Sequence, residues 1–187
     1  DANKNFYFLE MNTRLQVEHP VSELVTGVDL VEQMIYCADN KKLNISQKDI
    51  NLKGWSVESR IYAEDPTKDF LPSIGRVTEY IEPSKIEDKD QTIRNDTGIN
   101  PGSEVSLFYD PMISKLAVHS KDRATAIDLM INSLQNYYLS GVENNIEFLI
   151  SILDDKKFRK GEISTNFIKE KFPKGYYSNH NLSEYNK

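Results

Sequence analysis

The chain has 187 residues, of which 39% are hydrophobic and 28% are charged, a composition typical of a folded globular protein. Its formal net charge of −6 argues against a general nucleic-acid-binding surface or a basic membrane-binding surface. The single cysteine, Cys37, excludes an internal disulfide framework and a cysteine-rich zinc site. No apolar run approaches the roughly 18 residues that a membrane span requires. We therefore expect no nucleic acid and no membrane among the partners, and a reducing, intracellular setting.

The first predicted element is an apolar run, FYFLEM at residues 6–11, which is typical of a buried strand. The extended segment that follows is expected to end at Pro20. A helix is predicted over residues 29–39, because its start carries a D-x-x-E capping-box pattern. Residues 40–53 are polar and are predicted to form a surface connection. Because Asp1 is not an initiator methionine, we expect the chain to begin inside a longer one.

Residues 55–118 alternate with a period of two, which indicates an antiparallel sheet. The alternating runs are WSVESRIYAED, RVTEYIEP, SEVSLFYD and MISKLAVHS, with glycine and proline turns between them. Two amphipathic helices are predicted next, over 122–138 and 144–154, with Gly141 as a stop between them. A short helix over 165–172 is the last predicted element. The sequence therefore predicts an α+β fold, an antiparallel sheet with flanking helices.

Polar side chains occupy every second position of LEMNTRLQVEH, residues 9–19. In an extended backbone, one face would then carry Glu10, Asn12, Arg14, Gln16 and Glu18. A carboxylate beside an amide oxygen suits Mg²⁺, an arginine can hold a small planar oxyanion through two hydrogen bonds, and a second carboxylate could act as general base. The same alternation also describes any half-exposed strand with solvated ion pairs, so the pattern alone leaves both interpretations open.

A second charged position lies in VESRIYAED. The alternation places Glu58, Arg60, Tyr62 and Glu64 on one face of a strand. By itself this pattern favours an ordinary cross-strand ion pair, which contributes about 0.2–1 kcal/mol.

Residues 10–35, EMNTRLQVEHPVSELVTGVDLVEQMI, closely resemble the signature of the biotin carboxylases, the ATP-grasp enzymes of biotin-dependent carboxylation. Three later segments resemble the same family: GWSVESRIYAEDPTKDFLPSIGRV, DTGINPGSEVSLFYDPMISKLAVHSKDR and GVENNIEFLISILDDKKFRKGEISTNFI. The resemblance covers residues 4 to about 172. The chain departs from the family pattern at Ser59, Ile74 and Asn95, none of which is a candidate site residue.

The resemblance implies a role for each residue of the alternating row. Glu10 and Asn12 would bind the Mg²⁺ or Mn²⁺ ions that bridge the phosphates of ATP. Arg14, Gln16 and the backbone of Val17 would hold bicarbonate.

Three residues are implied to be catalytic. Glu18 would be the base that deprotonates bicarbonate, and Arg14 would lie near the biotin ring. Arg60, in the ESRI motif, would stabilise the biotin enolate and carboxyphosphate.

The implied cofactors are ATP, Mg²⁺ or Mn²⁺, and biotin carried on a separate domain. The implied partners are bicarbonate, the biotinylated carrier domain and a carboxyltransferase β subunit, in the cytoplasm of a bacterium or in the mitochondrial matrix. Within the family, the segments DTGINPGSEVSLFYDPMISKL and TNFIKEKFPKGYY most resemble α subunits of propionyl-CoA carboxylases. The 3-methylcrotonyl-CoA and acetyl-CoA enzymes remain alternatives, since the choice of acyl-CoA resides in the other subunit.

The resemblance divides the chain into three parts. Residues 1–45 would be the end of an ATP-grasp subdomain with the catalytic strand or loop, residues 54–172 the C-terminal subdomain, and residues 173–187 the start of a linker. The nucleotide-binding lysines and glycine-rich lid are expected upstream, so the chain alone should be inactive. Two alternatives are a non-catalytic scaffold or subunit-contact fragment and another ATP-grasp ligase, such as the carbamoyl-phosphate type.

Overall fold

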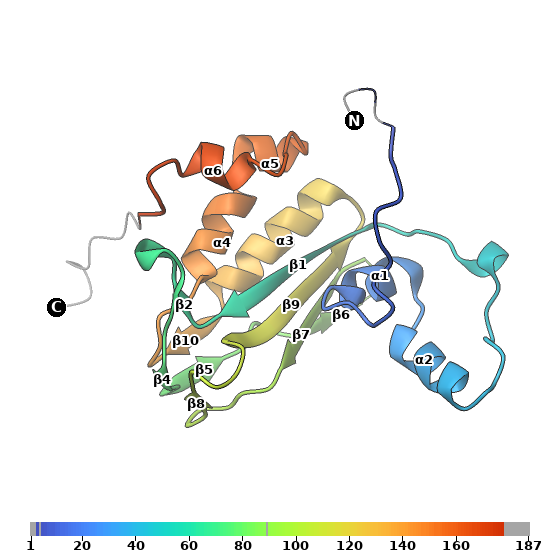
Figure 1. Cartoon of the computed structure of the whole chain (residues 1–187), viewed down its shortest axis with the longest axis horizontal. Coiled ribbons are helices and arrows are strands. Elements are labelled where there is room, and N and C mark those ends of the chain that lie inside the picture. Colours follow the sequence, from blue (N-terminus) through green and yellow to red (C-terminus); the bar gives the residue numbers. More distant parts are fainter. Residues whose placement is uncertain (1–2, 4, 89, 178–187) are drawn as a thin grey trace.

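The centre of the molecule is a four-stranded antiparallel sheet in the order β1–β9–β7–β6 (Figure 1). The computed structural model describes residues 3, 5–88 and 90–177. The strands of this sheet are β1 Trp55–Tyr62, β9 Met112–Ser120, β7 Thr92–Thr97 and β6 Ile86–Glu87. The antiparallel sheet predicted for the middle of the chain is therefore confirmed, and so is the α+β class.

Three two-stranded ladders surround this sheet, all of them antiparallel. They pair β2 Glu64–Asp65 with β3 Leu71–Pro72, β4 Gly75–Arg76 with β8 Glu104–Val105, and β5 Glu79–Ile81 with β10 Tyr138–Ser140. The predicted strand SEVSLFYD is wrong beyond β8, because the chain turns after Val105 and exposes Phe108 almost completely.

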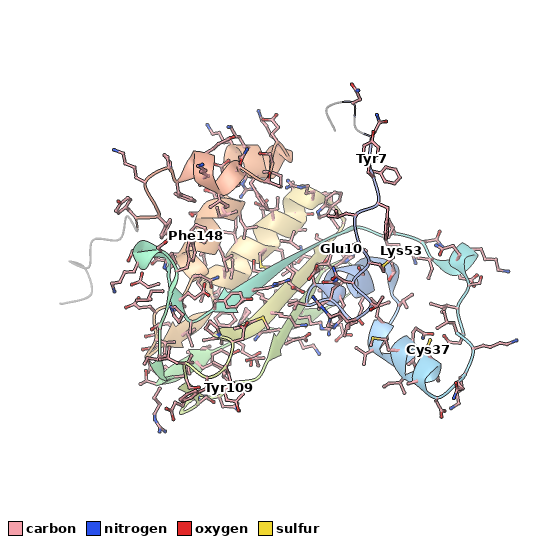
Figure 2. All side chains as sticks on the ribbon, viewed as in Figure 1. Tyr7, Glu10, Cys37, Lys53, Tyr109 and Phe148 are labelled. Atoms are coloured by element: carbon pink, nitrogen blue, oxygen red, sulfur yellow. The ribbon has the colours of Figure 1, made fainter. Side chains whose placement is uncertain are left out.

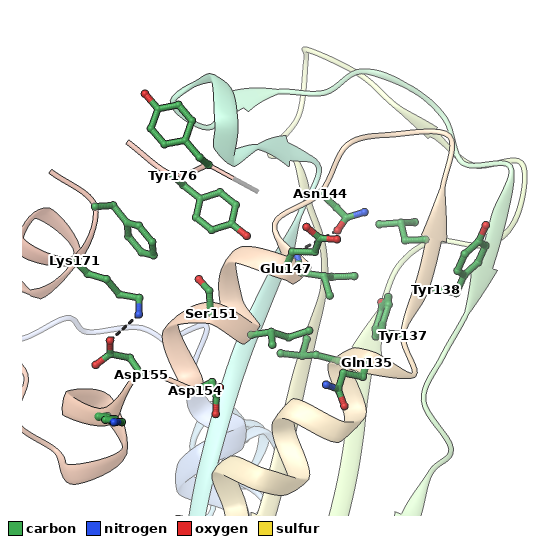
Figure 3. Close-up of a pocket in the computed structure, with 17 residues that line it drawn as sticks. Gln135, Tyr137, Tyr138, Asn144, Glu147, Ser151, Asp154, Asp155, Lys171 and Tyr176 are labelled. Carbon is green, nitrogen blue, oxygen red and sulfur yellow. Dashed lines mark hydrogen bonds and ion pairs between the residues drawn. The ribbon is translucent and has the colours of Figure 1, made fainter. Parts of the chain in front are cut away.

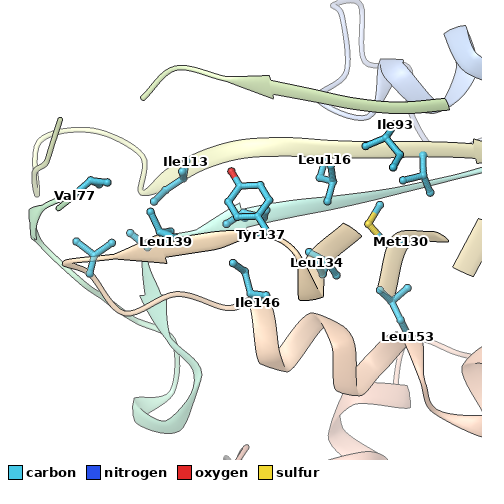
Figure 4. Close-up of a cluster of buried hydrophobic side chains, with 14 of the residues drawn as sticks. Val77, Ile93, Ile113, Leu116, Met130, Leu134, Tyr137, Leu139, Ile146 and Leu153 are labelled. Carbon is cyan, nitrogen blue, oxygen red and sulfur yellow. The ribbon is translucent and has the colours of Figure 1, made fainter. Parts of the chain in front are cut away.

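One face of the central sheet builds the hydrophobic core (Figure 4). Ile61 of β1 and Leu116 and Val118 of β9 point to this face and are fully buried. Helix α3, Arg123–Gln135, covers them with Ile127, Met130 and Leu134, and helix α4, Ile146–Leu153, packs beside it. The core is thus made on the side of the sheet opposite Arg60, which stands beside Lys115 on the other face.

The other face of the sheet carries helix α1, His19–Thr26, which packs on β1 and β9. The sequence analysis missed this helix, because it took Pro20 as the end of an extended segment. Proline is tolerated in the first turn of a helix, where its missing N–H needs no partner, and Pro20 occupies that position in α1.

Helix α2, Leu30–Ala38, confirms the helix predicted over residues 29–39. The side chain of Asp29 caps it by accepting a hydrogen bond from the Glu32 N–H at 2.8 Å. The polar connection that follows contains only the short 3₁₀ helix η1, Gln47–Asp49.

The segment before α1 forms no strand in residues 5–18. Phe6 is 95% exposed and Phe8 81% exposed, so the buried strand predicted there is wrong. The reason is the lack of a partner, since no strand in the described part of the chain pairs with this segment. Figure 2 shows Tyr7 and Glu10 on the stretch of backbone that leads to α1.

Helix α3 ends at Gln135, three residues before the predicted end. Tyr138 instead begins β10 and pairs with Ile81 of β5. The Tyr137 hydroxyl lies 2.8 Å from that of Tyr80 and 2.7 Å from the Ser114 hydroxyl. Pairing and hydrogen bonds across the fold therefore override the helical period of these two tyrosines.

Gly141 ends the strand β10 and not a helix. Its φ of +97° lies in the region that favours glycine, and a Cβ there would collide with the carbonyl oxygen of Arg76.

Two short helices follow α4 in the part of the chain that the structure describes, α5 Lys156–Lys160 and α6 Phe167–Lys171. The predicted final helix, residues 165–172, is confirmed as α6, whereas α5 was not predicted. None of the helices in the described part has the length and apolar character that a membrane crossing requires.

Candidate active site

The structure brings together two charged side chains from motifs that are 42 residues apart in the sequence. Arg60 Nη2 donates a hydrogen bond to Glu18 Oε2 at 2.8 Å. Glu18 is the residue just before α1, and Arg60 lies near the end of β1, on the sheet face that α1 covers. The packing of α1 on β1 therefore creates this pair, and the two side chains remain 55% and 40% exposed.

A groove of about 790 Å³ lies beside this pair. Three of the predicted site residues line it, Arg14, Gln16 and Glu18, together with Leu30, Met34 and Cys37 from α2. The carbonyl of Gln16 accepts a hydrogen bond from the His19 N–H at 3.2 Å and lies 2.8 Å from His19 Nδ1. Arg14 donates to the carbonyl of Leu15 at 3.2 Å, and its guanidinium is otherwise exposed on the rim.

The predicted row of side chains on one strand face is not formed. The backbone bends at Arg14 and turns at residues 17–18, so the row ends where α1 begins. Glu10 and Asn12 are exposed and do not line the groove. Their carboxylate and amide oxygens are of the kind that Mg²⁺ prefers, with phosphate and water as further ligands. Elsewhere, within the described residues, no cluster of three or more His, Cys, Asp or Glu side chains offers a metal site.

Glu58 lies beneath the Glu18–Arg60 pair, and its side chain is only 5% exposed. Its Oε1 is 4.0 Å from Arg60 Nε, and its Oε2 is buried without a hydrogen bond in the described structure. Burial raises the pKa of this carboxyl group above 4.5, and the charges of Lys115 and Arg60 oppose that shift only in part. Near neutral pH, the folded protein would therefore be more stable with an uncharged side chain at position 58.

This conclusion predicts a pH-dependent effect of Glu58→Gln. A raised folded-state pKa means that the stability from this group is present below pH 4.5 and is lost as the pH rises through the folded value. We expect the variant to be more stable than the wild type at pH 7 and close to it at pH 4. Urea midpoints at both pH values measure the difference. Glu170→Gln, at an exposed position, is the matched control. An equal difference at both pH values would contradict the prediction.

A chain of ion pairs crosses the same face of the sheet. Arg94 on β7 donates to Glu23 of α1 at 2.7 Å and, through two nitrogens, to both carboxylate oxygens of Asp96 at 2.8 and 2.9 Å. Lys115 on β9 lies 3.4 Å from Asp96 and donates to the carbonyl of Val17 at 3.3 Å. Arg94, Glu23, Asp96 and Lys115 were not predicted from the sequence. The only available signal was Lys115, as the one lysine within the apolar run MISKLAVHS.

A second cavity, of about 880 Å³, lies between α4 and the segment that follows α6 (Figure 3). Lys171 Nζ and Asp155 Oδ2 form an ion pair of 2.6 Å at its side, and the ring of Tyr176 packs edge-to-face on Phe148. None of its lining residues belongs to the groove beside Glu18.

Residues 58–170 match the family model described as biotin carboxylase C-terminal domain. The chain belongs to the biotin carboxylase family. Residues 1–46 match a second family model, the ATP-binding domain of the carbamoyl-phosphate synthase L chain. The long match over the C-terminal part decides between the biotin carboxylases and the carbamoyl-phosphate type of ligase.

Its relatives among curated proteins include propionyl-CoA carboxylase α chains. The chain is 51% identical to the human mitochondrial protein over 177 residues, which are 94% of this chain and 24% of the human one. It is 49% identical to the protein of Ruegeria pomeroyi over an alignment of 191 positions, which covers 94% of this chain and 28% of that one. The chain thus spans about a quarter of the length of these relatives.

A similar solved structure is the biotin carboxylase domain dimer of the 2-oxoglutarate carboxylase from Hydrogenobacter thermophilus, in complex with MgADP, ADP and bicarbonate. It is 43% identical with a TM-score of 0.86, and the match covers 92% of this chain and 37% of that one. The biotin carboxylase subunit of a pyruvate carboxylase is 39% identical with a TM-score of 0.85, covering 93% of this chain and 38% of that one.

Proposed function

We propose that this chain is part of a biotin carboxylase that uses MgATP to activate bicarbonate and then carboxylates biotin on a carrier domain. The pairing of Glu18 with Arg60 at 2.8 Å carries the proposal, because it joins a candidate base to a candidate anion stabiliser. In this reaction bicarbonate attacks the γ-phosphoryl group of ATP, giving carboxyphosphate and ADP. The carboxyl group then passes to the biotin ring nitrogen as its bond to the phosphoryl oxygen breaks, and the released phosphate takes the proton that the nitrogen loses.

Glu18 would take the proton from bicarbonate, and Arg60 would stabilise the negative charge that develops on the ureido ring of biotin. Their hydrogen bond supports these roles, since it orients the carboxylate and the guanidinium toward one point before either acts. Both side chains are partly exposed beside the groove, so a substrate could reach them.

Arg14, Gln16 and the backbone of Val17 would hold bicarbonate in the groove. A guanidinium suits a planar oxyanion, and Arg14 is an exposed residue that lines the groove. Glu10 and Asn12 would hold Mg²⁺ or Mn²⁺ by carboxylate and amide oxygens. The ion would neutralise charge on the phosphates of ATP when it is bound.

The domain division that we propose is residues 1–45, the end of an ATP-grasp subdomain, residues 54–172, the C-terminal subdomain, and residues 173–187, the start of a linker. The separate family matches over 1–46 and 58–170 support it. The names of the relatives, propionyl-CoA carboxylase α chains, support an acyl-CoA carboxylase that acts on propionyl-CoA. A carboxyltransferase β subunit and a biotinylated carrier domain would be its partners, as the resemblance to the family implies. The compartment would be the bacterial cytoplasm or the mitochondrial matrix, since both kinds of relative occur.

The experiment that tests the metal assignment is Glu10→Gln in the full-length protein. The amide keeps the shape of the side chain and removes a charged ligand for a hard cation. We expect about a tenfold rise in the Mg²⁺ concentration that half-saturates ATP cleavage. The thermal midpoint should stay unchanged, because Glu10 is exposed. Asp90→Asn, the same change of carboxylate to amide at another exposed position, is the control. An unchanged metal dependence would remove Glu10 from the site.

A further inference from the structure

We propose that Lys115 is a positioning residue, which holds the carbonyl of Val17 and thereby sets Glu18 against Arg60. The inference rests on the proposed function, because it concerns the geometry of the same site. It assigns a role in the reaction to a residue of the C-terminal sheet that lies outside the sequence motifs of the site.

The register of the sheet puts Lys115 next to the site. Lys115 of β9 is the direct cross-strand partner of Arg60 on β1, so the two side chains stand on one face. Arg60 bonds the side chain of Glu18 at 2.8 Å, and Lys115 bonds the carbonyl of the preceding residue, Val17, at 3.3 Å. Two neighbouring strands therefore make hydrogen bonds to two consecutive residues of one turn, Val17 and Glu18.

The hydrogen bond from Lys115 to the Val17 carbonyl restrains more than one atom. A peptide unit is planar, and no cis peptide occurs in the described residues. Fixing the Val17 carbonyl therefore fixes the plane that also contains the Glu18 N–H and Cα. Glu18 is the residue just before α1, so the position of its side chain depends on the peptide plane that Lys115 holds.

The ammonium group of Lys115 is itself held in place. Its side chain is 15% exposed, and a cation with so little water needs fixed acceptors. Asp96 supplies one at 3.4 Å, and Asp96 is held in turn by the two nitrogens of Arg94. Arg94 also bonds Glu23, whose other oxygen accepts from the Leu30 N–H at 2.9 Å. The network thus connects α1 to the sheet at two points, just before the start of the helix and in its middle.

If the role of Lys115 were purely structural, removing the lysine would give a different result from the one that the positioning role predicts. If Lys115 served only to neutralise Asp96, its loss would lower stability and leave the kinetics of folded enzyme intact. If it positions the turn, its loss should weaken the use of bicarbonate while the binding of MgATP persists. A displacement of about 1 Å in a reacting group can reduce the rate by up to about a hundredfold.

The test is Lys115→Met in the full-length protein, with steady-state kinetics against bicarbonate and against MgATP. We expect kcat/KM for bicarbonate to fall about tenfold or more, and KM for MgATP to change by less than about twofold. Lys157→Met removes an exposed lysine paired with Glu170 and should change neither value. Equal loss for both substrates, or a fall in the thermal midpoint alone, would overturn the proposal.

A second variant protects the test against misfolding. Asp96→Asn combined with Lys115→Met removes one charge of each sign, so Arg94 and Glu23 remain as a balanced ion pair. The double variant should reproduce the loss in kcat/KM for bicarbonate with less loss of stability, and wild-type kinetics in this variant would again overturn the proposal. Glu18→Gln separates the two hypotheses. If that variant keeps full carboxylation, the proposed function fails, whereas a severe loss there with normal kinetics in Lys115→Met refutes only the positioning role.

Discussion

Arg60→Ala in the full-length protein should reduce biotin carboxylation by roughly a hundredfold or more, while the affinity for MgATP stays within about twofold. The guanidinium bonds Glu18 at 2.8 Å and lies 4.0 Å from Glu58, and neither is a proposed phosphate or metal ligand. Its removal therefore takes charge from the reacting centre and leaves the nucleotide contacts intact. Glu18→Gln should show the same separation, since loss of a general base costs about 10²–10⁴ in rate.

Nucleotide affinity and carboxylation rate must be measured on the same samples to separate these outcomes. Arg76→Ala is a matched control, because Arg76 is an exposed arginine of β4 that donates to the carbonyl of Gly102 at 3.2 Å and does not line the groove. Loss of both properties in equal measure in Arg60→Ala would mean that the Glu18–Arg60 pair is structural, and the proposed roles of both residues would be withdrawn.

Arg94→Met should lower the free energy of unfolding by about 2–3 kcal/mol, because it leaves the Glu23 carboxylate without a cation and leaves Asp96 with Lys115 alone. Glu23 has a side chain that is only 11% exposed, and Asp96 one that is 33% exposed. Hydrogen bonds with Asp96 raise the pKa of Arg94, and the net pKa of Asp96 is lowered despite its burial. Both shifts indicate that the charged pair is favoured in the folded state. Urea unfolding of the chain at pH 7 measures the change.

Arg159→Met provides a control of the same chemistry. Arg159 is as exposed as Arg94, at 32% against 34%, but its partners Asp128 and Asp154 are 63% and 70% exposed. We expect a loss below about 1 kcal/mol there, since water replaces the lost partner. Adding Glu23→Gln to Arg94→Met should restore part of the stability by removing the buried charge. Equal losses in the two single variants would show that burial of the carboxylates has no part in the effect.

Some of the fold follows from the sequence alone. The run MISKLAVHS forms β9 over the predicted residues, with Leu116 and Val118 on the core face and Lys115 and His119 on the other face. The Asp29 cap also predicts the start of α2, since a cap depends on residues within one turn. The motif EMNTRLQVEHP was sufficient to indicate the family, and its polar residues are the candidate site.

The rest depends on contacts between distant segments. The run TIRNDT of β7 has a single apolar residue, Ile93, and carries no strand signal, because its charges serve the ion pairs with α1 and β9. The run FYFLEM shows the opposite case. Its apolar side chains predict a strand, but a strand forms only where a partner strand is present, and these residues stay exposed without one in the described structure.

The site shows the same division. Glu18 and Arg60 were identified singly from their motifs, but their hydrogen bond exists because α1 packs across β1 and β9. Lys115 bonds the carbonyl of Val17, which lies 98 positions earlier in the sequence. Arg94 bonds Glu23, which lies 71 positions earlier. Sequence periodicity reports which face a side chain takes within its own strand or helix. Which faces meet is decided by the register of the sheet and the packing of α1, and these place Lys115 beside Arg60.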